Sequence, residues 1–85
     1  MANETVRRTF NINNFESLVI EGNGSDDNPH KAHLLAERDC LVKAQLSMTR
    51  IFNVRMQHNT GHELDSVAYS VVVSEISGID KDLIL

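Results

Sequence analysis

The segment EGNGSDDNPHK, residues 21–31, constrains the fold more than any other stretch of the chain. It is rich in Gly, Asn and Asp and leads into Pro29, a residue favoured at the first helical position because its missing N–H needs no partner there. Asn28 or Asp27 can accept hydrogen bonds from the exposed amides. The sequence therefore predicts a helix over about residues 29–50, a stretch of good helix formers without Gly.

The predicted helix has two apolar faces when its residues are placed at 100° intervals. The broader face carries Leu34, Cys40, Leu41, Ala44, Met48 and Ile51. A second face, about a quarter turn away, carries Leu35, Val42 and Leu46, while Lys43, Asp39 and Arg50 share the polar side. The helix either lies on its own sheet alone or also meets another subunit through the second face.

The segments on both sides of the helix have the character of strands. Before it, residues 5–21 alternate apolar and polar residues around Asn13-Asn14, which indicates one kinked strand or a tight pair of strands. After it, residues 52–76 predict a hairpin, because its second half places apolar side chains on one face with a period of two, namely Val67, Tyr69, Val71 and Val73.

The chain is therefore predicted to be α+β, with one long helix packed on an antiparallel sheet in the order β-α-β-β. Its 85 residues form one domain, 1–85, and residues 1–8 are expected to be disordered or frayed. The apolar end Leu83-Ile84-Leu85 docks either on this domain or on a partner.

Composition disfavours several classes of function. The net charge is −4, and the eight Lys and Arg residues are scattered, so clustered phosphate contacts are not expected. With no Trp and one Tyr there is little surface for base stacking, and nucleic acid is not an expected partner. A single Cys excludes an internal disulfide, and no apolar run approaches the length of a membrane span. We expect a cytoplasmic protein with no membrane contact.

The four histidines raise the question of a metal site. His58 and His62 are four residues apart, but Asn and Gly between them favour a loop, in which solvated histidines are the simpler interpretation. His30, His33 and Glu37 share one helix face, an arrangement that also arises on a solvated first turn. The sequence predicts no metal site, and these five residues are the candidates.

No set of residues supports catalysis. Cys40 lies among apolar neighbours without an evident base, and buried thiols are usually inert. GNGSDDN precedes a helix but lacks the Lys of a phosphate loop, and no nucleophile-elbow pattern is present. The chain is not expected to be an enzyme.

The predicted order of elements resembles that of the dodecins. Residues 18–76 are similar to the family's short strand ending in Gly-Ser, here Gly24-Ser25, followed by a helix and two long antiparallel strands. The resemblance implies a hollow homo-oligomer with packed sheets and outer helices that binds flavin between subunits. The family's flavin-stacking Trp is replaced by Ile51 or a neighbour, and its Gln after the third-strand Tyr is Ser70.

Five residues are the candidates for contact with a flavin by this resemblance. They are Ile51, Arg55, Gln57, Tyr69 and Ser70. Because the chain has no Trp, we predict no cofactor, and flavin stays as the alternative.

Taken together, these features suggest a small non-enzymatic binding protein that self-associates through its sheet and helix into a homo-oligomer. One alternative is a dodecin-like carrier of flavin or another small molecule. A second is a phage or mobile-element accessory protein that binds a host protein through its acidic surface.

Overall fold

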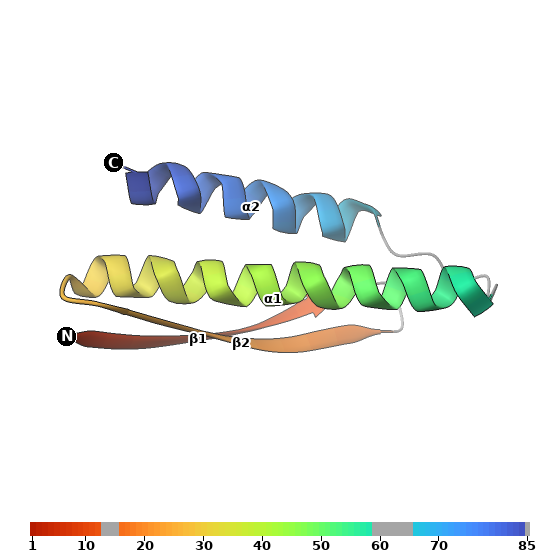
Figure 1. The fold of residues 1–85 in the computed structure, drawn as a ribbon, viewed down its shortest axis with the longest axis horizontal. Coiled ribbons are helices and arrows are strands. Elements are labelled where there is room, and N and C mark those ends of the chain that lie inside the picture. The colour runs from red at the N-terminus through yellow and green to blue at the C-terminus, as the bar shows by residue number, and fades with distance from the viewer. Residues whose placement is uncertain (13–15, 59–65, 85) are drawn as a thin grey trace.

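A two-stranded hairpin is followed by a long helix and a second helix (Figure 1). The computed structural model describes residues 1–12, 16–58 and 66–84, with the backbone alone at 52–58 and 66–67. The elements are β1 (Ala2–Asn11), β2 (Ser17–Asp26), α1 (Pro29–His58) and α2 (Ser66–Ile84). The protein is thus a small α+β domain with the order β-β-α-α, and the predicted order β-α-β-β is wrong.

α1 lies between the hairpin on one side and α2 on the other (Figure 1). The domain is elongated, with extents of 47 × 20 × 20 Å. In the described ranges, with 13–15, 59–65 and 85 set aside, no helix combines the length and the apolar character needed to cross a membrane.

The hairpin is antiparallel, in register from Ala2 opposite Asp26 to Asn11 opposite Ser17. Even-numbered residues of both strands are buried or half-buried, and odd-numbered residues are exposed. This period of two is expected when one face of a sheet packs on a core and the other meets water. The expectation that residues 1–8 are frayed is wrong, because β1 begins at Ala2. The predicted bend at Asn13-Asn14 lies outside the described residues.

The start of α1 is fixed by side chains in the preceding turn. The helix begins at Pro29, where the sequence predicts it. Asn28 Oδ1 accepts hydrogen bonds from the N–H of His30 at 2.9 Å and from that of Lys31 at 3.4 Å. These are two of the amides that the first turn of a helix leaves without an internal partner. Asp26 Oδ1 in turn accepts from the N–H of Asn28 at 2.9 Å.

The predicted hairpin over residues 52–76 is wrong. Residues 52–58 extend α1 beyond its predicted end near residue 50, and α2 begins at Ser66. The burial of three neighbouring valines shows why α2 is a helix: Val72 is 1% exposed, whereas Val71 and Val73 are 51% and 40% exposed. A strand would place Val71 and Val73 on one buried face, while a helix turns them to opposite sides of Val72.

Small residues allow α1 to lie close to β2. A Cβ atom on Gly22 would overlap the backbone of Ala36 and Cys40, and one on Gly24 would overlap the backbone of Ala32 and Ala36. The matching stripe on the helix is fully buried and consists of Ala32, Ala36, Cys40 and Ala44. Both glycines are therefore positions where strand and helix backbones meet almost directly.

The core joins all three layers. Phe10 of β1, Leu41 and Met48 of α1, and Val72 and Ile79 of α2 belong to one buried cluster. Most of the broader apolar face predicted for the helix is thus covered within the chain. The second predicted face is less covered, since Leu35 and Val42 are half-buried and Leu46 is 57% exposed.

Candidate functional site

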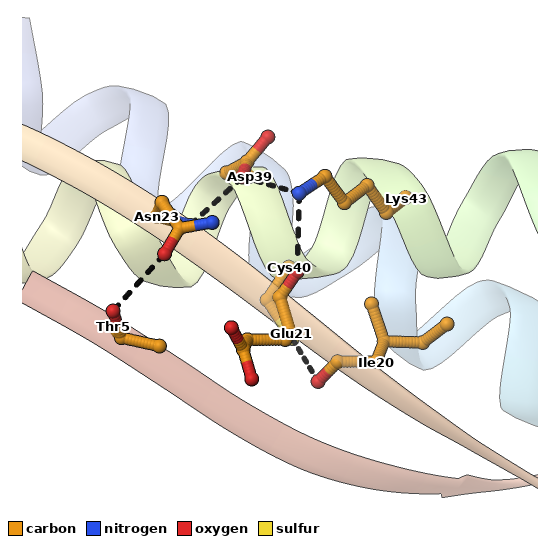
Figure 2. Close-up of polar contacts among 7 residues, drawn as sticks. All are labelled: Thr5, Ile20, Glu21, Asn23, Asp39, Cys40 and Lys43. Carbon is orange, nitrogen blue, oxygen red and sulfur yellow. Dashed lines mark hydrogen bonds and ion pairs between the residues drawn. The ribbon is translucent and has the colours of Figure 1, made fainter.

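The two edges of the hairpin differ in their contacts with the rest of the fold. At the edge of β2, Asn23 N–H donates a hydrogen bond to Asp39 Oδ2 at 2.8 Å, and Lys43 Nζ donates to the carbonyl of Glu21 at 3.1 Å (Figure 2). Asp39 and Lys43 are themselves paired at 2.9 Å. Both side chains come from α1, which therefore occupies hydrogen-bonding groups that β2 would otherwise offer to another strand.

These contacts also affect the charge of Asp39. The hydrogen bond from the Asn23 amide, and then the one from Lys43, hold the pKa of the Asp39 carboxyl below its ordinary value. The carboxylate is the form that accepts both bonds, so the contacts favour ionisation. At the next residue of α1, Cys40 Sγ–H donates to the carbonyl of Ile20 at 3.3 Å, and burial raises the pKa of this thiol.

The register shows which groups β1 presents at its own edge. Asn23 N–H and Glu21 C=O point away from β1, as their bonds to α1 require. In an antiparallel pair, residues with outward groups lie opposite one another. Asn23 lies opposite Thr5 and Glu21 opposite Arg7, so Thr5 and Arg7 direct their N–H and C=O groups away from β2.

In the described part of the chain, no side chain caps the outward backbone groups of β1. The solvent-facing side chains of β1 make their polar contacts with β2: Thr5 Oγ1 donates to Asn23 Oδ1 at 3.0 Å, and Asn3 Oδ1 accepts from Ser25 Oγ at 2.6 Å. β1 therefore has an open edge, formed by its odd-numbered residues.

A groove of about 190 Å³ lies where this open edge meets α2. Its walls include Phe10 of β1, together with Val71 and Val72 of α2. Across it, Arg8 makes two hydrogen bonds to Glu75, at 3.3 and 3.2 Å, and its guanidinium lies 5.0 Å from the centre of the Phe10 ring. The half-exposed Val71 is thus an apolar contact available beside the edge of β1.

The residues predicted to contact a flavin lie on two helices and not on neighbouring strands. Ile51 is half-buried on α1, and Tyr69 on α2 accepts a hydrogen bond from Gln45 Nε2 at 3.2 Å through its hydroxyl. Ser70 is exposed, and with Tyr69 it borders an open depression of about 610 Å³ lined by α2 residues alone. The side chains of Arg55 and Gln57 lie outside the described part. The β-α-β-β order on which the dodecin resemblance depended is absent.

The predicted metal candidates are brought together only in part. His33 Nε2 lies 3.0 Å from Glu37 Oε1, one turn away on α1, while His30 is exposed and its N–H is held by Asn28. Over residues 1–12, 16–58 and 66–84, no group of three or more His, Cys, Asp or Glu side chains has a geometry suited to a metal ion. The side chain of His58 and all of His62 lie outside the described residues.

Sequence reasoning missed the contrast between the two edges. Asp39 and Lys43 were assigned only to the polar side of the helix, although their i, i+4 spacing predicts a mutual ion pair. Gly22 and Gly24 enter the sequence-based prediction only as part of the segment that leads into Pro29. Their alternation with Leu18 and Ile20 was the available signal for a strand that α1 approaches closely.

Comparisons with known proteins add no assignment. No protein-family model, no curated protein and no solved structure matches the chain.

Proposed function

We propose that the protein is a small non-enzymatic binding protein that self-associates by pairing β1 with β1 of a second copy. The observation that carries this proposal is the contrast between the edges: side chains of α1 occupy two outward groups of β2, the N–H of Asn23 and the C=O of Glu21, and in the described residues no side chain occupies an outward group of β1. Natural folds usually protect exposed edges, so an edge left open beside a protected one is a candidate for strand addition.

The size of the sheet favours the same interpretation. An isolated two-stranded sheet is marginal, and this one is stabilised by packing on α1; further strands widen a sheet that already has a hydrophobic face. β1 is ten residues long and contains no Pro, so a second β1 can pair along its length. Antiparallel pairing of two copies forms a four-stranded sheet, and Val71 beside the joined edges gives this strand an apolar neighbour.

The edge is tested by removing a single outward N–H with proline. Arg7→Pro removes one from the open edge of β1. Glu21→Pro is the matched control, because Glu21 lies opposite Arg7 and its N–H also points outward, at the edge that α1 protects. Proline is tolerated at edge positions whose N–H is not part of the ladder, so both variants are expected to fold.

Sedimentation equilibrium at high micromolar concentration gives the readout. We expect twice the chain mass for the wild type and for Glu21→Pro, and a lower average mass with a larger dissociation constant for Arg7→Pro. Each lost hydrogen bond is worth about 1 kcal/mol, and a symmetric pair of strands loses two, so the affinity falls roughly tenfold or more. A monomeric wild type contradicts self-association, and an equal effect of both prolines contradicts the assignment to β1.

A further inference from the structure

We infer that the two copies of β1 pair in one register, antiparallel about a two-fold axis through Val6. This inference rests on the proposed self-association and specifies which residues meet. In this register Val6 lies opposite Val6 of the second copy, Glu4 opposite Arg8, Thr5 opposite Arg7, and Ala2 opposite Phe10.

The faces of the sheet limit the choice of register. The even-numbered residues of β1 face the helices, and the odd-numbered ones face solvent. An axis through a residue pairs even positions with even positions and keeps the two buried faces on the same side. An axis between two residues pairs even with odd, which turns the buried set of one copy toward solvent. The axis therefore passes through a residue.

Two charged side chains on the buried face indicate which residue the two-fold axis passes through. Glu4 and Arg8 are half-buried, point toward the helices, and lie at equal distances along the strand from Val6. Inward-pointing charges usually oppose the addition of a strand. With the axis at Val6, each Glu4 lies beside Arg8 of the other copy, and both charges gain a partner of opposite sign.

The neighbouring registers lack this compensation. An axis through Thr5 places Glu4 opposite Val6 and leaves Arg8 opposite Ala2. An axis through Arg7 places Glu4 opposite Phe10 and sets the two Arg7 residues against each other. Like charges directly opposite one another, and charges set against apolar side chains, both disfavour pairing.

The groove beside Phe10 fits the same register. The groove has a volume of about 190 Å³ and lies between the end of β1 and α2. The Val6 register brings Ala2 of the second copy to this position, and Ala2 has the smallest of the inward side chains on β1. Arg8, which already pairs with Glu75, would then lie between Glu75 and Glu4 of the second copy.

A disulfide between the two copies would show directly which residue lies on the two-fold axis. In antiparallel strands, opposite residues without mutual hydrogen bonds have Cα atoms about 4.5 Å apart, within the range of about 4.4–6.8 Å that a disulfide spans. Val6→Cys is therefore expected to form a covalent dimer under mild oxidation. Glu4→Cys is the control, because its two copies would lie four residues apart along the strands, about 13 Å. The wild type controls for Cys40, which is fully buried.

Charge reversal gives a second and independent readout. Glu4→Lys sets like charges opposite each other at two symmetric positions and is expected to weaken the dimer about tenfold. Arg8→Glu combined with Glu75→Lys keeps the contact between β1 and α2 with its charges reversed, and also weakens self-association. Mixing the two variants restores both attractive pairs across the axis, so a heterodimer of wild-type affinity is expected.

The outcomes separate the register from the proposed function. A covalent Val6→Cys dimer together with recovery in the mixed sample supports the Val6 axis. A dimeric wild type in which Glu4→Cys cross-links as readily as Val6→Cys, or in which mixing restores nothing, overturns the register and leaves self-association in place. A wild type that stays monomeric in sedimentation equilibrium overturns both.

Discussion

Asp39 of α1 accepts a hydrogen bond at 2.8 Å from the outward N–H of Asn23 at the edge of β2. With Lys43 bound to the outward carbonyl of Glu21, the helix that covers the face of the hairpin also protects part of one edge. The other edge, β1, has no equivalent protection among the described residues.

Replacing Asp39 should destabilise the domain in a pH-dependent way. The folded-state pKa of Asp39 is lowered, so its contribution is present above the unfolded pKa of about 3.9 and is lost as the pH falls through the folded pKa. The group is partly exposed, so we expect Asp39→Ala to reduce the free energy of unfolding by about 1 kcal/mol at neutral pH. Urea unfolding at neutral and at acidic pH measures this.

The matched control for this prediction is Asp82→Ala, at an exposed position on α2. It should leave the free energy of unfolding almost unchanged at both pH values. If Asp39→Ala costs as much in acid as at neutral pH, the ionised carboxylate is not the origin of the effect.

Gly22→Ala should be among the most destabilising single substitutions. The added Cβ would overlap the backbone of α1 at Ala36 and Cys40, and neither backbone can move without separating helix and strand. We expect a loss of several kcal/mol, on the order of 3, as for overpacked cores. Gly78→Ala is the control, since nothing lies within 4 Å of its added Cβ, and it should stabilise α2 by about 0.5–1 kcal/mol. Thermal and urea unfolding of both variants provide the comparison, and equal effects would contradict the close approach.

The start of α1 could be read from the sequence, whereas the order of elements could not. Pro29 and Asn28 act through local chemistry, the fixed backbone angle of proline and a short side-chain acceptor, and local chemistry is visible in a sequence. The run from Val67 to Val73 is different, because β-branched residues favour strands locally and alternate in a way that suits one. What decides for a helix is burial of Val72 against α1, a tertiary contact.

The candidate edge lay beyond sequence reasoning for the same kind of reason. Glu4, Val6 and Arg8 form a period-two pattern, but two charges within it resemble a frayed polar terminus. Their inward orientation depends on the pairing of Val6 with Gly22, more than a dozen residues away. The roles of Asp39 and Lys43 likewise require knowing that β2 passes beside that side of α1.

The pair formed by Arg8 and Glu75 should couple β1 to α2 weakly. Its side chains are 38% and 39% exposed, which limits the free energy that an ion pair contributes. A double-mutant cycle with Arg8→Ala and Glu75→Ala should give a coupling free energy of about 0.5–1 kcal/mol. Arg38 and Asp80, paired elsewhere between α1 and α2, serve as a comparison of similar exposure. If the coupling free energy is near zero for Arg8 and Glu75 but not for Arg38 and Asp80, the contact between Arg8 and Glu75 does not hold β1 to α2.

The thiol of Cys40 should be unreactive in the folded protein. It is fully buried, its pKa is raised by burial, and it donates a hydrogen bond to the carbonyl of Ile20. Because the thiolate is the reactive form, an aromatic disulfide reagent should modify Cys40 only at the rate of opening or unfolding. Rapid modification without denaturant would contradict the packing of α1 on β2.

Amide hydrogen exchange followed residue by residue at two protein concentrations tests the use of the β1 edge most directly. The N–H groups of Thr5 and Arg7 point away from β2, so they should exchange rapidly in dilute protein and become protected as the concentration rises. The N–H of Asn23, held by Asp39, should be protected at both concentrations. If Thr5 and Arg7 exchange at the same fast rate in concentrated protein, β1 does not pair with a second copy.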